Sequence, residues 1–162
     1  MKTYFVKLVS VAALSLLALL ANANDSDNDD FAFGMISAES LLTGYDEFNN
    51  NFQEFALSQE EQNVIADWPK NLTIDVYFGT WCHDSLREVP KLLKILSGNK
   101  DIKLSLIGLD HQKQDPEDLV SVNKVKYTPT IIVYRDTDKK HEIGRIIERP
   151  RSSLVADISR FL

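Results

Sequence analysis

The feature that most constrains the fold is an apolar run that leads through one glycine into a segment with helical spacing. Residues 74–78 are mainly β-branched or aromatic, which is typical of a buried strand. After Gly79, residues 83–96 place apolar side chains on one face of a helix, at Leu86, Val89, Leu92, Leu93 and Leu96. The pattern therefore predicts a buried strand that leads through a short turn into an amphipathic helix.

The only cysteine of the sequence, Cys82, lies at the predicted start of this helix. Free N–H groups and the positive end of the helix dipole favour a thiolate there, and the thiolate is the nucleophilic form of cysteine. His83 as an imidazolium would favour the thiolate further, whereas the Asp84 carboxylate would oppose it. Two interpretations of Cys82 follow: a reactive thiol, or a buried and inert side chain. His83 likewise either tunes the thiol or is an exposed polar residue of the first helical turn.

The Trp-Cys-x-x-Ser sequence of Trp81, Cys82 and Ser85 resembles the active-site turn of the thioredoxin superfamily, with Ser85 in place of the second cysteine. The resemblance implies that Cys82 is the nucleophile and that Trp81 contacts the substrate. One helical turn after Cys82, the Ser85 hydroxyl would donate to the thiolate or accept from a free backbone amide. Because serine cannot form a disulfide, a mixed disulfide on Cys82 would last until another thiol attacked it.

Two proline positions extend the resemblance. Pro90 stands eight residues after the cysteine, where thioredoxins have a helix-kinking proline, and Thr128-Pro129 resembles the cis-proline loop of that family. The resemblance implies a cis bond before Pro129 and a Thr128 backbone that faces an extended substrate opposite Cys82. Over residues 71–162 it predicts an α/β thioredoxin-like fold, a central mixed sheet flanked by helices. Residues 31–70 are predicted to be an N-terminal helical extension packed on this domain.

Two positions depart from the thioredoxin pattern. The buried aspartate of that family falls at Val76 here, and Asp75 is one residue away, so the Asp75 side chain is predicted to face the opposite side of the sheet. The lysine partner of that aspartate is replaced by Leu106. We therefore expect Asp75 to bind a backbone or helix amide and not to accept a proton from Cys82.

The first residues have the pattern of a cleaved signal peptide. Two lysines flank the start, residues 8–20 are an apolar run, and a small-x-small site ends at Ala23. The pattern predicts a signal peptide over residues 1–23, with export to the periplasm of a Gram-negative bacterium or otherwise secretion. The alternative is a membrane anchor, which the short apolar run and the acidic residues 24–30 disfavour. Residues 24–30 are predicted to be a flexible mature N-terminus beginning at Asn24.

Charge and cysteine content narrow the classes of partner. The net charge is −6 at pH 7, so a polyanion such as nucleic acid is not an expected partner. A metal site of Cys82, His83 and Asp84 is not expected, because consecutive residues at a helix start point in different directions. No cofactor is predicted. The predicted partners are protein or small-thiol disulfides, since a single cysteine cannot pair within the chain.

The remaining segments predict the order of elements. A strand is expected at residues 31–36, two helices within residues 38–55 with a break near Gly44, and a helix that begins at the capping box of Ser58 and Glu61. Further along, the patterns predict strands at residues 103–109, 130–134 and 142–147, a short helix at 116–122 and a closing helix at 152–162.

Three functional hypotheses follow from these observations. In the first, an exported thioredoxin-like protein uses Cys82 for thiol–disulfide exchange through mixed disulfides with protein or small-thiol partners. In the second, the fold has lost redox turnover and binds peptides across Trp81 and the Thr128-Pro129 loop. In the third, Cys82 senses oxidants through a sulfenic acid. The rate at which Cys82 is alkylated distinguishes the first hypothesis from the second.

Overall fold

The structure is a computed structural model that describes residues 31–162. The predicted signal peptide and the predicted acidic N-terminus lie outside the described residues. None of the helices in this part of the chain is long and apolar enough to cross a membrane.

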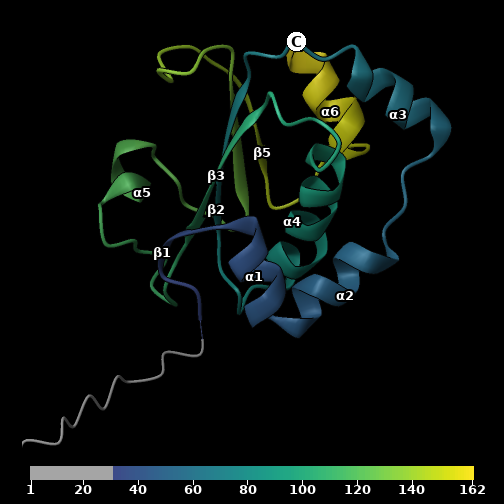
Figure 1. The fold of residues 1–162 in the computed structure, drawn as a ribbon. Coiled ribbons are helices and arrows are strands. Elements are labelled where there is room, and N and C mark those ends of the chain that lie inside the picture. Colours follow the sequence, from purple (N-terminus) through teal and green to yellow (C-terminus); the bar gives the residue numbers. More distant parts are fainter. Residues whose placement is uncertain (1–30) are drawn as a thin grey trace, which may run out of the picture.

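A five-stranded mixed sheet forms the centre of the described chain, in the order β1-β3-β2-β4-β5 (Figure 1). Strand β2 (Thr73–Phe78) is parallel to β3 (Lys103–Gly108) and antiparallel to β4 (Thr130–Tyr134). Strand β5 (Glu142–Ile147) is antiparallel to β4, and the short β1 (Gly34–Ile36) is antiparallel to β3. This sheet, flanked by helices, confirms the predicted α/β thioredoxin-like fold.

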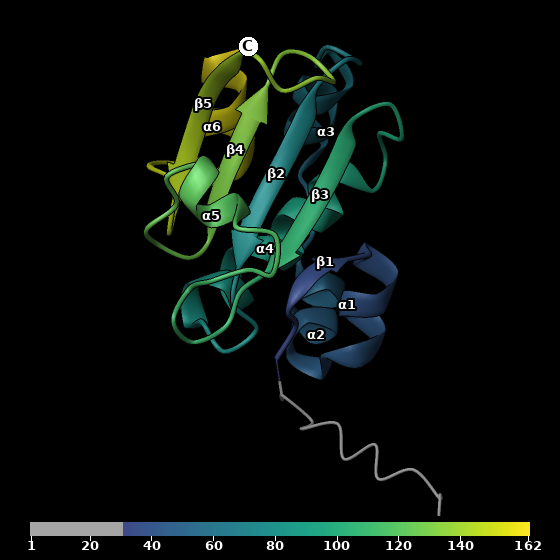
Figure 2. The same ribbon diagram turned by 90° about the vertical axis from the view of Figure 1, so that its left-hand side faces the viewer.

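The helices lie unequally on the two faces of the sheet. They are α1 (Ala38–Gly44), α2 (Asp46–Glu54), α3 (Gln59–Ala66), α4 (His83–Leu96), α5 (Leu119–Val122) and α6 (Leu154–Phe161). Figures 1 and 2 show that α5 lies on the opposite side of the sheet from α4 and α6, with α1 and α2 packed near α4. The described helices therefore cover one face heavily, and the other face carries only the short α5.

Alternation along β2 sends its side chains to two different environments. Ile74, Val76 and Phe78 are fully buried in the main core, which contains the apolar side chains of α4 and α6. Tyr77 belongs to the smaller cluster on the other face, together with Ile132 and residues of α5. The whole of β2 is buried, which explains why the predicted central strand reads as a continuous apolar run interrupted only by Asp75.

Helix α3 begins as its sequence predicts. The Glu61 N–H donates to Ser58 Oγ over 3.2 Å, and the Ser58 N–H donates to Glu61 Oε2 over 2.9 Å. This reciprocal capping box satisfies two amides at the helix start, and such caps contribute about 1 kcal/mol.

The predicted helix over residues 116–122 is shorter in the structure. Asp118 has a φ of 57°, in the left-handed region, so regular helix begins only at Leu119. The Asp115 carboxylate accepts hydrogen bonds from the backbone N–H groups of Glu117, Leu119 and Val120. Local side-chain bonding of this kind competes with helix formation, which accounts for the late start.

Candidate functional site

Cys82 is the N-cap residue of α4, at the junction that the sequence predicts. Its backbone N–H donates to Gly79 O over 3.0 Å, which closes the turn after β2, and its thiol is half-buried. Within residues 31–162, the start of α4 has no side-chain cap, and the Cys82 side chain makes no capping hydrogen bond. The first-turn amides are therefore left to stabilise a negative charge near Cys82, as expected for a thiolate at a helix start.

The thiol faces the Thr128-Pro129 loop. Cys82 Sγ donates to the carbonyl oxygen of Thr128 over 3.2 Å, and the Thr128-Pro129 peptide bond is cis. The Glu148 N–H donates to Pro129 O over 2.7 Å, so the start of the β5–α6 connection holds the loop in place. The cis bond and the position of the Thr128 backbone opposite Cys82 agree with the sequence prediction.

Ser85 is bonded through its hydroxyl to the backbone of the turn. Its side chain is fully buried, and its Oγ accepts a hydrogen bond from the Gly79 N–H over 3.3 Å. Of the two roles predicted for this hydroxyl, the structure shows the bond to a backbone amide, although the amide belongs to the turn and not to the helix. No hydrogen bond joins Ser85 to Cys82 within residues 31–162. Ser85 therefore fixes the turn that presents the cysteine.

Trp81 covers the same turn from outside. Its indole Nε1 donates to Leu109 O over 3.0 Å, and the ring lies so close to Gly79 that an added Cβ would be 2.5 Å from it. The ring centroids of His111 and Trp81 are 5.1 Å apart, and those of Phe31 and His111 are 5.4 Å apart. Sequence reasoning assigned no role to His111, because a loop residue 30 positions after Trp81 has no local pattern that places it there.

The N-terminal segment directly contacts the turn that carries Cys82. The Ala32 N–H donates to Thr80 Oγ1 over 3.2 Å, and on the main-core side Asn51 Nδ2 donates to Leu86 O over 2.8 Å. These bonds connect the segment before β1 to the turn and α2 to the first part of α4. The environment of Cys82 therefore depends on residues far earlier in the chain.

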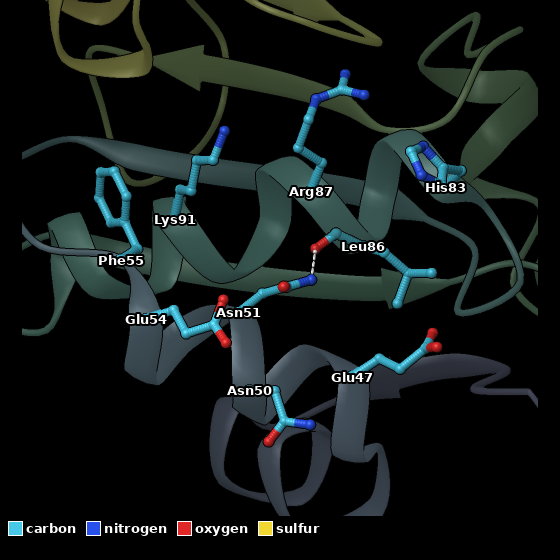
Figure 3. A pocket seen from close by; sticks show the side chains of 9 residues that line it. All are labelled: Glu47, Asn50, Asn51, Glu54, Phe55, His83, Leu86, Arg87 and Lys91. Carbon is cyan, nitrogen blue, oxygen red and sulfur yellow. Dashed lines mark hydrogen bonds between the residues drawn. The ribbon is translucent and has the colours of Figure 1, made fainter.

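His83 and Asp84 begin α4 next to the thiol. The Asp84 carboxylate lies 2.6 Å from Arg87 Nη1, so an adjacent cation offsets part of the repulsion that Asp84 exerts on a thiolate. His83 is exposed and lines a groove between α2 and α4 (Figure 3). The structure shows no hydrogen bond from its ring to Cys82, and a tuning role for His83 stays a prediction. Pro90 lies inside α4, as the resemblance implies.

The expectation that Asp75 binds an amide is wrong. Asp75 does face the opposite side of the sheet from Val76, but its Oδ1 lies 2.8 Å from Lys139 Nζ, and its side chain is only 3% exposed. Lys139 lies in the loop between β4 and β5. Leu106, which replaces the lysine of the thioredoxin pattern, is buried in the main core. A long-range partner of this kind leaves no local trace in the sequence. Asp75 thus forms an ion pair remote from Cys82.

Two buried tyrosines lie beside this ion pair. Burial and the Asp75 carboxylate raise the pKa of Tyr134 to about 12, and burial followed by the charge of Asp75 also raises the pKa of Tyr77. Asn123 links them, since its Nδ2 donates to the Tyr77 hydroxyl over 2.8 Å and its Oδ1 accepts from the Tyr134 hydroxyl over 3.2 Å. The far face of the sheet therefore holds a connected polar cluster.

Within residues 31–162, no three His, Cys, Asp or Glu side chains come together in a way that could hold a metal ion. The chemistry available at the described site is that of the Cys82 thiol, the Thr128 carbonyl and the amides at the start of α4.

Comparison with known proteins identifies the family. The thioredoxin family model matches residues 36–156, which include α1 to α3 as well as the turn and the cis-proline loop. The chain belongs to the thioredoxin family. Its thioredoxin-like domain supports a redox-related role.

Solved structures share the fold of this thioredoxin-family chain. A protein of unknown function from Pseudomonas aeruginosa is 18% identical with a TM-score of 0.55, over 68% of this chain and 67% of that chain. An HIV epitope scaffold is 18% identical with a TM-score of 0.52, over 75% of this chain and 74% of that chain. At these identities the likeness shows the fold alone. No curated protein matches the chain.

Proposed function

We propose that this thioredoxin-family protein is exported and carries out thiol–disulfide exchange through one reactive thiol, Cys82. The observation that carries the proposal is the half-buried Cys82 Sγ at the uncapped start of α4, 3.2 Å from the carbonyl of the cis-proline loop. A thiol in this position is accessible to a partner and is next to amides that stabilise its thiolate.

The proposed step begins when Cys82 releases its proton to solvent. The Cys82 thiolate attacks one sulfur of a partner disulfide, a new S–S bond forms, and the partner's other sulfur leaves as a thiolate that takes up a proton. Asp75 plays no part as proton acceptor, because it faces the opposite side of the sheet from Val76 and is paired with Lys139. The product is a mixed disulfide between Cys82 and the partner.

Loss of the proton also frees the Thr128 carbonyl. In the thiol form this oxygen accepts the Sγ–H of Cys82, whereas a thiolate has no proton to donate. The carbonyl is then free to accept an N–H group from the backbone of an extended partner segment, as in the addition of a strand to an open edge. Deprotonation of Cys82 and recognition of the partner backbone are thereby coupled at one atom.

Resolution of the mixed disulfide requires a thiol from outside the chain. Cys82 is the only cysteine, and the buried Ser85 hydroxyl is bonded to the turn. A second thiol of a protein or small molecule attacks the Cys82–partner disulfide, and Cys82 leaves as a thiolate. The sequence pattern of residues 1–23 supports export, and an exported protein meets partners that carry disulfides.

The test is reaction of the purified protein with an excess of a neutral disulfide peptide, followed by intact-mass measurement. The proposal expects one covalent adduct on Cys82, release of one equivalent of peptide thiol, and no adduct on a Cys82→Ser protein. Absence of an adduct on a folded wild-type protein would instead support the peptide-binding hypothesis. Mass measurement of protein collected from the exported fraction tests the proposed start at Asn24.

A further inference from the structure

A groove of about 550 Å³ lies between α2 and α4, next to the proposed reactive thiol. His83, the residue after Cys82, stands at one end of it, and Phe55 stands at the other (Figure 3). The α2 wall carries Glu47 and Glu54, and the α4 wall carries Arg87 and Lys91. A partner segment that continues past its own half-cystine on this side of Cys82 would enter this groove.

The charges of the α4 wall are already paired. Arg87 Nη1 lies 2.6 Å from Asp84, Arg87 Nε lies 2.6 Å from Glu88, and Lys91 Nζ lies 3.5 Å from Glu88. These four side chains hold two positive and two negative charges. Figure 3 also shows Arg87 and Lys91 pointing away from α2. The α4 wall therefore offers little net charge to a ligand in the groove.

The charges of the α2 wall are not paired. Glu47 and Glu54 are exposed, and neither has an ion-pair or hydrogen-bond partner for its carboxylate within the described residues. They are seven residues apart, which places them on the same side of α2, about 10.5 Å from each other along the axis. A segment in the polyproline II conformation has three residues per turn and advances about 3.1 Å per residue, so side chains three residues apart lie on the same side, about 9 Å from each other, close to this spacing.

We infer that the groove between α2 and α4 binds a basic peptide segment of the disulfide partner, through Glu47 and Glu54. The inference rests on the proposed exchange at Cys82 and adds to it the chemistry of the partner: lysine or arginine residues spaced about three apart, on one side of a polyproline II segment near the reacting disulfide. The net charge of the chain, −6, would attract such a segment over a longer range.

The experiment compares three disulfide peptides that differ only at two positions three residues apart beside the cysteine. One peptide has lysine at both positions, one has serine and one has glutamate, and each carries the same chromophoric leaving thiol. At low salt the lysine peptide should react with Cys82 about three- to tenfold faster than the serine peptide, and the glutamate peptide should be slowest. High salt should remove most of this difference, because exposed charges are screened.

A pair of matched variants separates the groove from the overall charge. Glu47→Gln/Glu54→Gln should bring the ratio of the lysine-peptide rate to the serine-peptide rate close to one. Glu60→Gln/Glu117→Gln makes the same change of net charge at exposed residues of α3 and of the segment before α5, outside the groove, and should preserve most of the ratio. Equal loss in the two double variants would overturn the inference, as would a wild-type protein that reacts equally with all three peptides.

A binding measurement distinguishes failure of the groove from failure of the exchange activity. A fluorescently labelled, cysteine-free lysine peptide should bind the Cys82→Ser protein more tightly than the serine peptide does, and Glu47→Gln/Glu54→Gln should abolish this preference. If Cys82 reacts with none of the disulfide peptides while this preference persists, the proposed exchange fails and the groove assignment stands. If Cys82 reacts with the serine peptide but no charge preference appears in either assay, the groove assignment fails alone.

Discussion

Replacement of Gly79 by alanine is expected to displace Trp81 and destabilise the turn that carries Cys82. A Cβ at this position would lie 2.5 Å from Cε2 and 2.8 Å from Cζ2 of the indole, far inside the ~3.5 Å contact distance of carbon atoms. The ring would have to move by about 1 Å, at a cost of about 1–3 kcal/mol for overpacking. The Trp81 Nε1 bond to Leu109 O, now 3.0 Å long, would be weakened or lost, a further cost of about 0.5–1.5 kcal/mol.

The entropy that alanine removes from the unfolded chain offsets about 0.4–1 kcal/mol of this cost, so Gly79→Ala should lower the free energy of unfolding by about 2–3 kcal/mol. Urea unfolding followed by circular dichroism measures the change, which corresponds to a fall in Tm of roughly 5–10 °C. The matched control is Gly98→Ala, since no atom lies within 4 Å of its added Cβ. A Gly79→Ala protein as stable as Gly98→Ala would refute the close packing of Trp81 on the turn.

Three further changes test other parts of the structure. Ser85→Cys should form a disulfide with Cys82 in air, as one helical turn separates them, and two free thiols under oxidising conditions would contradict the inferred turn. Lys139→Met leaves the buried Asp75 carboxylate without its cation and should cost about 1–3 kcal/mol in urea unfolding, the exposure of the lysine reducing the penalty. Because burial raises the pKa of Tyr134 from 10.0 to about 12, the native state keeps this proton when the unfolded state loses it. The stability contributed by Tyr134 should be complete below pH ~10 and should fall above it by up to ~1.4 kcal/mol per pH unit, in addition to the fall from Tyr77, so Tyr134→Phe should reduce the total slope without abolishing it.

Much of the fold could be predicted from the sequence because its main elements have strong local patterns. The continuous apolar run of β2 and the helical spacing of α4 are independent of the rest of the chain, and together they place Cys82 at their junction. The capping box of Ser58 and Glu61 is equally local. Helix α5 is the counter-example, since the side chain of Asp115 competes for its first amides and delays its start.

The partners of the site residues were harder to predict because they come from distant parts of the chain. The period of two along a strand was enough to show that Asp75 faces away from Val76, but the approach of Lys139 depends on how the β4–β5 loop folds back. The stacking of His111 on Trp81 and the bond from Ala32 to Thr80 are similarly long-range. For Ser85, the spacing allowed two bonds, and the turn geometry selected the one to Gly79.

The central claim, a single reactive thiol that depends on an external thiol for release, can be tested in one time course. Wild-type protein is loaded with a neutral disulfide peptide, excess peptide is removed, and intact mass is followed before and after addition of a small thiol. The account predicts that the adduct on Cys82 persists until the thiol is added and then disappears with recovery of the free cysteine. Spontaneous loss of the adduct without added thiol, or failure of Cys82 to form one, would contradict it.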